Sequence, residues 1–354
     1  MLNFIDNKYM QRCIDIAKHG KGNVAPNPLV GCVIVHDGTI IGEGFHACYG
    51  NSHAEVNAIQ SVKDKSLLLS STLYVNLEPC CHQGKTPPCT DLILQHKIPT
   101  IVVGNIDVNP KVATKGIEIL KSNGCEVKTG VLENECYQLN KRYFTFLQQH
   151  RPYIILKWAQ TLDGFMDIDV SLKEKGESYW ITNEALKYKV HKWRAEEDAI
   201  YVGANTVYND NPQLNIRYGS GKNPIRISFF YEKIKNTLYH FFDNKQPTII
   251  FNTLYDKKDG NVQYVKLSNP ANYIEEMLHY LYEIKCQSII IEGGKKTLEK
   301  FILKNSWDEA RILIGNKIFG KGLSAPSIPF SPHKIETIED DKILHIQKCD
   351  KLHL

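Results

Sequence analysis

The chain has 354 residues, enough for about two domains of ordinary size, and its composition is that of a globular protein. The formal net charge is +4, and no lysine- or arginine-rich run stands out, which argues against nucleic-acid binding. No apolar run is long enough to cross a bilayer, and the first residues lack the pattern of a signal peptide.

The ten cysteines are too sparse in a chain of this length to suggest a disulfide scaffold. Thiols that bind a metal need a reducing compartment, so we expect a cytoplasmic protein. Its partners are expected to be small molecules rather than nucleic acid or membrane. Whether the chain forms a homo-oligomer is left open.

The first 150 residues alternate between predicted strands and helices. Asp37-Gly38 predicts a hairpin turn between the first two strands. Strands are expected over 29–35, 39–44, 72–75, 101–103 and 125–127, and helices over 9–18, from 53 onward, over 112–121 and over 133–149. The alternation predicts a three-layer α/β/α domain. His150-Arg151-Pro152 breaks the last helix, and the predicted domains are therefore 1–150 and 151–354.

A metal-binding motif lies in this first half. His53 and Glu55 form a His-x-Glu pair, and Pro79-Cys80 and Cys89 follow it. This order is the signature of zinc-dependent deaminases. A catalytic zinc site uses three protein ligands and keeps a fourth position for water. We therefore predict one Zn²⁺ per chain, held by His53, Cys80 and Cys89, with Glu55 free to transfer protons as the catalytic acid and base.

A purely structural zinc site is the alternative. It would need four protein ligands, and Cys81 or His82 could supply the fourth. It would leave no task for Glu55. The presence of Glu55 in the expected place favours the catalytic interpretation.

Several segments around the motif carry a family resemblance. They are Asn27-Pro28-Leu29-Val30-Gly31, His46, the long Cys80–Cys89 spacing with Lys85-Thr86-Pro87-Pro88 inside it, and Asp107-Val108-Asn109-Pro110. The first half resembles the deaminase half of the bifunctional riboflavin-biosynthesis deaminase/reductase family, and so implies a cytidine-deaminase-like domain. The resemblance implies the following contacts to a pyrimidine ribotide: Asn27, His46, His82, Lys85 and Asn109.

The second half begins with a predicted strand over 153–159. A helix over 184–194 and a strand over 198–203 follow, and a strand from 288 leads through Gly293-Gly294 into a helix over 295–302. Paired glycines let the backbone approach a phosphate, and the helix N-terminus favours its charge. No G-x-G-x-x-G motif follows the first strand, so a Rossmann domain is not expected.

This half resembles the reductase half of the same family, which has a dihydrofolate-reductase-like α/β fold and uses NADPH. The resemblance implies that the cofactor is bound by Lys157, Ala159, Trp180, Thr206, Asp210, Gly293 and Gly294. It implies that the substrate is bound by Ser178, Arg194, Leu214, Arg217 and Glu292. Asp210 is the first candidate for the catalytic proton donor of the reduction, and Glu292 is the second.

The sequence departs from the family pattern at three places in this half. Thr161 replaces a serine, the segment before Trp180 is longer and contains Lys173-Glu174-Lys175, and Phe229-Phe230 stands where a strand usually ends in aspartate. That strand flanks the cofactor in the family. The choice between NADPH and NADH is therefore left open.

The resemblance implies a bifunctional enzyme of riboflavin biosynthesis. The first half would deaminate a diaminopyrimidine ribotide, and the second would reduce the ribosyl group of the product to ribityl. An active deaminase with a degenerate or differently specific reductase domain is the alternative. A nucleic-acid deaminase would want a basic face with interleaved aromatic residues, which the charge balance does not supply.

Overall fold

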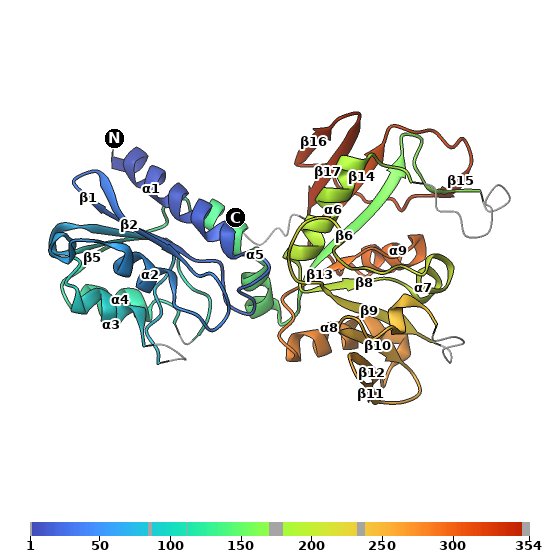
Figure 1. Cartoon of the computed structure of the whole chain (residues 1–354), viewed down its shortest axis with the longest axis horizontal. Helices are drawn as coiled ribbons and strands as arrows, with labels where there is room; N and C mark the ends of the chain where they lie inside the picture. Colours follow the sequence, from blue (N-terminus) through green and yellow to red (C-terminus); the bar gives the residue numbers. More distant parts are fainter. Residues whose placement is uncertain (1, 84–86, 111, 170–179, 232–237, 349–354) are drawn as a thin grey trace. The chain divides into compact units, whose positions relative to one another are not determined.

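The computed structural model describes residues 2–83, 87–110, 112–169, 180–231 and 238–348. These residues form two compact units, Met1–His150 and Arg151–Leu354, each with its own sheet and core (Figure 1). Within the described ranges, no helix is long and apolar enough to cross a membrane.

The first unit is built on a five-stranded sheet of order β2-β1-β3-β4-β5. Its strands are β1 (Gly31–His36), β2 (Thr39–Phe45), β3 (Thr72–Leu77), β4 (Thr100–Asn105) and β5 (Glu126–Thr129). β1 is antiparallel to both β2 and β3, whereas β3, β4 and β5 run parallel. The turn between β1 and β2 has positive φ at both Asp37 and Gly38, as a tight hairpin requires.

Helices cover both faces of this sheet, which confirms the predicted three-layer architecture (Figure 1). One face packs against α2 (Ala54–Ser61), α3 (Cys89–Gln95) and α4 (Lys115–Ser122). The other face packs against α1 (Leu2–Ala17) and α5 (Glu133–Gln149). Two short 3₁₀ helices, η1 (Lys18–Gly20) and η2 (Lys65–Ser70), complete the unit.

Three of the boundaries that differ from the sequence-based expectation are instructive. α1 begins at Leu2, although its buried face begins only at Tyr9, where the apolar spacing starts. β1 begins at Gly31 because the main chain of Leu29 bonds the side-chain amides of Asn76 and Asn140 instead of a strand. α4 begins at Lys115 because Thr114 has a left-handed backbone, with φ of 64°.

The second unit is built on a ten-stranded sheet of order β11-β12-β10-β9-β8-β13-β6-β14-β17-β16. Its strands are β6 (Tyr153–Thr161), β8 (Ala199–Tyr201), β9 (Ile225–Phe230), β10 (Thr248–Asn252), β11 (Lys257–Asp259), β12 (Val262–Lys266), β13 (Ser288–Ile291), β14 (Glu309–Gly315), β16 (Lys334–Ile338) and β17 (Asp341–Gln347). The seven strands from β12 to β14 run parallel, and antiparallel strands flank them. β7 (Phe165–Ile168) and β15 (Gly322–Ser324) pair separately.

Helices also cover both faces of the second sheet. One face packs against α8 (Tyr273–Glu283) and α9 (Lys295–Leu303). The other packs against α6 (Glu184–Glu196) at β6, β13 and β14, and against α7 (Ala204–Asp210) at β8, β9 and β10. The remaining described elements are η4 (His240–Phe242) and η5 (Pro270–Asn272). This mixed α/β unit agrees with the predicted fold class.

Phe229 and Phe230 lie at the end of β9 and serve as packing residues. Phe229 stacks on Tyr273 with ring centroids 4.4 Å apart. Phe230 is buried and contacts the rings of Tyr208 and Phe241. The structure therefore gives the unusual pair an apolar role at both faces of the sheet.

Candidate active sites

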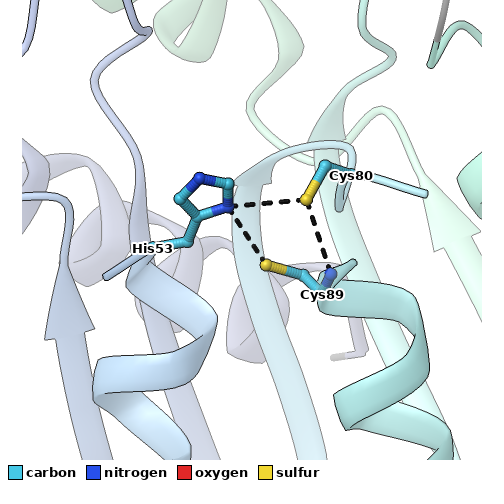
Figure 2. Close-up of side chains that lie close together, drawn as sticks. All are labelled: His53, Cys80 and Cys89. Carbon is cyan, nitrogen blue, oxygen red and sulfur yellow. Dashed lines mark hydrogen bonds between the residues drawn. The ribbon is translucent and has the colours of Figure 1, made fainter. Parts of the chain in front are cut away.

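Three predicted metal ligands meet in the first unit. The candidate ligand atoms of His53, Cys80 and Cys89 all lie within 4.8 Å of one another. His53 Nδ1 is 3.3 Å from Cys89 Sγ and 3.4 Å from Cys80 Sγ. Figure 2 shows the three side chains pointing toward one another. Two thiols and one imidazole are a donor set that suits zinc.

Each ligand is held at the end of a regular element. His53 precedes α2, Cys80 follows β3, and Cys89 is the first residue of α3. The backbone N–H of Cys89 donates to Cys80 Sγ over 3.4 Å. β3 lies at the centre of the sheet, so its carboxyl end brings Cys80 to the edge where α/β sheets bind ligands.

The electrostatics of the cluster favour a thiolate. A hydrogen bond from Cys89 lowers the pKa of Cys80 to about 4, and His53 acts in the same direction. The hydrogen bond to Cys80 raises the pKa of His53. Because a metal binds the deprotonated thiol, this environment prepares Cys80 as a ligand.

Cys81 and His82 could have completed a four-ligand structural site. In the part of the chain that the structure describes, the cluster consists of His53, Cys80 and Cys89 alone. His82 is exposed. A cluster of three candidate ligands matches the number of protein ligands in a catalytic zinc site, in which water takes the fourth position.

Glu55 lies two residues after His53, in the first turn of α2, and only 3% of it is exposed. Burial raises the pKa of Glu55 to about 7, and the nearby charge of Cys80 adds to this. Its carboxylate accepts a hydrogen bond from Cys89. A carboxyl that titrates near neutral pH can both take and return a proton.

Asn27 and His46 form a hydrogen-bonded chain beside the metal cluster. His46 Nδ1 donates to the carbonyl of Ser52 over 3.1 Å, and Asn27 Nδ2 donates to His46 Nε2 over 3.0 Å. The ring of His46 meets that of His53 edge-on, with centroids 5.6 Å apart. Because both ring nitrogens of His46 are engaged, Asn27 is the better placed of the two to contact a substrate.

A second buried acidic group supports the loop that carries Asn109. Asp107 accepts the Asn109 N–H at 2.8 Å and the hydroxyl of Tyr143 at 3.1 Å. Burial raises the pKa of Asp107 to about 6. Glu78, directly before Pro79-Cys80, accepts backbone N–H groups from three positions of the same region. Sequence patterns alone did not predict these supporting contacts. Lys85 lies outside the described residues.

The second unit contains a cavity of about 280 Å³. Six of the predicted reductase residues line it: Lys157, Ala159, Trp180, Arg194, Arg217 and Glu292. They come from β6, α6, the segment before α6, the loop after α7 and the end of β13. Lysine and arginine outnumber the single carboxylate, so the cavity suits an anionic ligand.

Glu292 is the electrostatic centre of this cavity. Its carboxylate accepts two hydrogen bonds from Arg194, at 3.1 and 2.7 Å, and lies 3.5 Å from Lys157 Nζ. Burial alone would raise the pKa of Glu292, but the charges of Arg194 and Lys157 outweigh it and lower the pKa to about 2. Glu292 is therefore a carboxylate at neutral pH.

Trp180 lies at the exposed side of the cavity, with 53% of its surface accessible. The ammonium of Lys187 is 4.2 Å from the centroid of its ring, and Lys317 donates to its carbonyl. Lys187 and His191 also line the cavity from α6, although neither was predicted. Lys187, His191 and Arg194 follow one another at steps of four and three residues, a spacing that could have shown that all three share one helix face.

The remaining predicted reductase residues lie elsewhere. Among the described residues, Thr206, Asp210, Leu214, Gly293 and Gly294 are not part of the cavity wall. Leu214 is buried in an apolar cluster with Val207 and Phe230. Asp210 is the exposed last residue of α7. Ser178 lies outside the described residues.

The glycine turn after β13 forms a second candidate site. Gly294 precedes α9, and among the described residues no side chain caps the first turn of this helix. A Cβ on Gly293 would come within 2.8 Å of the Thr297 side chain, so the tight turn excludes larger residues. A Cβ on Gly294 would lie 3.7 Å from Thr206 Oγ1, which shows that α7 approaches the same turn.

Comparison with known proteins agrees with the division of the chain into two units. Residues 4–105 match the family model of the cytidine and deoxycytidylate deaminase zinc-binding region, and residues 152–348 match that of the RibD C-terminal domain. The riboflavin biosynthesis protein RibD of Aquifex aeolicus is 36% identical, over 98% of this chain and 100% of its own length. RibD of Bacillus amyloliquefaciens is 36% identical, over 97% and 92%.

Two solved structures are similar to this chain over nearly its whole length. The diaminohydroxyphosphoribosylaminopyrimidine deaminase/5-amino-6-(5-phosphoribosylamino)uracil reductase of Thermotoga maritima has a TM-score of 0.89 and 37% identity, over 99% of this chain and 100% of its own. RibD of Acinetobacter baumannii has a TM-score of 0.88 and 30% identity, over 98% and 100%.

The two domains define a bifunctional enzyme that combines a deaminase with a reductase. The chain belongs to the RibD family of riboflavin biosynthesis proteins.

Proposed function

We propose that residues 1–150 remove an amino group from 2,5-diamino-6-(5-phosphoribosylamino)pyrimidin-4(3H)-one. The products are 5-amino-6-(5-phosphoribosylamino)uracil and ammonia. The observation that carries this proposal is the cluster of His53, Cys80 and Cys89 beside the buried Glu55. The structure of the Thermotoga maritima relative bears the name of this activity.

His53, Cys80 and Cys89 would hold one Zn²⁺. When bound, the metal supplies Lewis acidity that makes water a nucleophile near neutral pH. Glu55 would take one proton from the attacking water and give it to the ring nitrogen. It would then take the second proton from the new hydroxyl group and give it to the amino group, which leaves as ammonia while the carbonyl forms. Burial helps both steps, because it raises the pKa of Glu55 to about 7, where the carboxyl can both accept and release a proton near neutral pH.

The pyrimidine ribotide would be held around this centre. Asn27 contacts the ring, and His46 orients the Asn27 amide through the hydrogen bond between them. His82 and Lys85, which lie between the two cysteines in the sequence, would contact the ribosyl phosphate or the ring substituents. Asn109 completes the site from the loop that Asp107 and Tyr143 support.

We propose that residues 151–354 use NADPH to reduce the ribosyl group to ribityl. The hydride goes to C1 of the open imine form of the sugar. Gly293-Gly294 and the first turn of α9 bind the pyrophosphate, since this turn leaves backbone N–H groups without a side-chain cap in the described structure. Thr206 flanks the same turn, and Lys157, Ala159 and Trp180 contact the cofactor from the cavity wall.

The substrate of this step would be bound by the charged side of the cavity. Arg217 binds the ribosyl phosphate, because its guanidinium can meet two oxygens at once. Arg194 and Glu292 contact the polar groups of the pyrimidine, and Ser178 and the main chain at Leu214 complete the site. Asp210 remains the first candidate for the proton donor and Glu292 the second.

A coupled assay on zinc-loaded protein tests both halves. With the diaminopyrimidine ribotide, we expect ammonia release, followed by NADPH oxidation that depends on the deaminated product. Glu55→Gln should abolish ammonia release and leave reduction of supplied uracil ribotide intact. Asp210→Asn should abolish the reduction of supplied uracil ribotide and leave ammonia release intact.

The same assay separates the remaining alternative, a deaminase with a degenerate or differently specific reductase domain. That alternative predicts ammonia without NADPH oxidation, even when uracil ribotide is supplied directly. Ammonia release that persists in Glu55→Gln would refute the assignment of the deaminase site. Parallel titrations with NADH would show which nicotinamide cofactor is preferred.

A further inference from the structure

One face of α6 forms a wall of the reductase cavity. Lys187, Val190, His191 and Arg194 all line it. The same helix is anchored to the sheet through Leu186, Val190 and Trp193, which are buried against β6, β13 and β14. Side chains on this face are therefore held in fixed positions relative to the strands that supply Lys157 and Glu292.

The cations of the cavity are not equally engaged. Arg194 and Lys157 share the carboxylate of Glu292. Arg217, from the loop after α7, is exposed and makes its side-chain hydrogen bond to Gln213, at 3.1 Å. Its guanidinium is thus available to an anionic ligand, but it stands at the end of a long side chain on a loop.

His191 connects this loop to the helix. Its Nδ1 accepts a hydrogen bond from the backbone N–H of Arg217 over 3.1 Å. Its ring meets that of Tyr218 edge-on, with centroids 5.0 Å apart, and 3% of the residue is exposed. The main chain at Arg217 is therefore tied to a buried side chain of the cavity wall.

We propose that His191 is a positioning residue of the reductase, which fixes the main chain at Arg217 so that the guanidinium meets the substrate phosphate. This inference rests on the proposed role of Arg217 as the phosphate ligand. On this proposal, His191 contributes to the affinity for the substrate and takes no part in hydride transfer.

The protonation state of the ring agrees with this role. Burial and the positive charges of Arg194 and Arg217 lower the pKa of His191 to about 4. The ring is neutral at neutral pH, so Nδ1 keeps the lone pair that accepts the Arg217 N–H, and the ring proton resides on Nε2.

Three substitutions of His191 distinguish the role of Nδ1 from that of Nε2. The amide of Asn reaches the place of Nδ1, and that of Gln reaches the place of Nε2. We expect His191→Asn to keep the KM for the phosphorylated substrate within about threefold, because it preserves an acceptor for the Arg217 N–H. His191→Gln and His191→Ala should raise this KM about tenfold, as expected for one lost hydrogen bond.

Three readouts distinguish positioning from a general structural defect. In His191→Gln and His191→Ala, kcat and the KM for NADPH should stay within about twofold of wild type. The deaminase activity of the same chain serves as an internal control. A substrate that lacks the 5-phosphate should show no added loss. If His191→Ala does not fold, the Asn and Gln variants carry the comparison.

A double-mutant cycle with Arg217→Ala completes the test. We expect His191→Ala to add little in the Arg217→Ala background, because both changes remove the same phosphate contact. A full additional loss in that background, or an equal loss with the unphosphorylated substrate, would overturn the role of His191. If Arg217→Ala leaves the KM unchanged, the proposed phosphate site fails together with the inference.

Discussion

The guanidinium of Arg194 meets the carboxylate of Glu292 through two hydrogen bonds, from Nε to Oε1 at 3.1 Å and from Nη2 to Oε2 at 2.7 Å. Lys157 approaches the same carboxylate. One buried anion thus neutralises cations from α6 and β6, and its removal would leave both without a counter-charge.

Glu292→Gln should therefore destabilise the second unit by about 3–5 kcal/mol, the usual cost of leaving a buried charge unpaired. Reductase activity should be lost, and deaminase activity should remain. Chemical unfolding and the two separate assays measure these effects. Glu283→Gln is the matched control, because Glu283 is exposed and pairs only loosely with His279, 3.5 Å away. Equal stability of the two variants would contradict the prediction.

The metal cluster predicts a zinc stoichiometry. Wild-type protein should contain one zinc per chain, and Cys80→Ser or Cys89→Ser should lose both the metal and deaminase activity while NADPH-dependent reduction persists. Cys81→Ser should keep the zinc, because Cys81 is outside the cluster of the described residues. Elemental analysis of purified variants decides this. Loss of zinc from Cys81→Ser would instead indicate a four-ligand structural site.

Asp107 predicts a pH dependence of stability in the first unit. Burial raises its pKa from 3.8 to about 6, so between these values the folded state binds more protons than the unfolded state. Stability contributed by this group is present below pH 3.8 and is lost as pH rises through 6.

Asp107→Asn removes this titration. The variant should gain stability relative to wild type as pH rises from about 4 to about 6, by about 1–3 kcal/mol, and the difference should then stay constant. Urea unfolding at several pH values measures it. A difference that does not change with pH would refute the assignment.

Trp180 provides a spectroscopic test of cofactor binding. It is 53% exposed at the cavity, whereas Trp158, Trp193 and Trp307 are buried. NADPH should quench tryptophan fluorescence in wild type and quench it far less in Trp180→Phe. The KM for NADPH should rise about tenfold in Trp180→Ala, as expected for a lost ring contact. Undiminished quenching in Trp180→Phe would place the nicotinamide cofactor elsewhere.

Local sequence patterns predicted much of the first unit. The alternation of strands and helices gave the layers, and Asp37-Gly38 gave the hairpin. The spacing of His53, Glu55, Cys80 and Cys89 indicated a metal cluster that the fold then assembles. These features are readable because each depends on residues that are close in sequence, or on ligand chemistry that few residue types can supply.

Other features could not be read locally. Thr114 interrupts a helical pattern because its backbone N–H is accepted by Glu78, which lies 36 positions earlier. Leu29 leaves its strand because Asn140, from α5, bonds its main chain. In both cases a distant polar side chain decides which hydrogen bond the backbone makes, and local propensity is overruled.

By itself, the sequence determined the two-unit α/β architecture, the candidate metal-binding residues near Glu55 and the family. The tertiary structure alone decided the reductase cavity. Strand order places β6 between β13 and β14, and this brings Lys157 beside Glu292, while the packing of α6 adds Arg194 and His191. These residues are far apart along the chain, so their charges and hydrogen bonds can act on one another only after the sheet has formed.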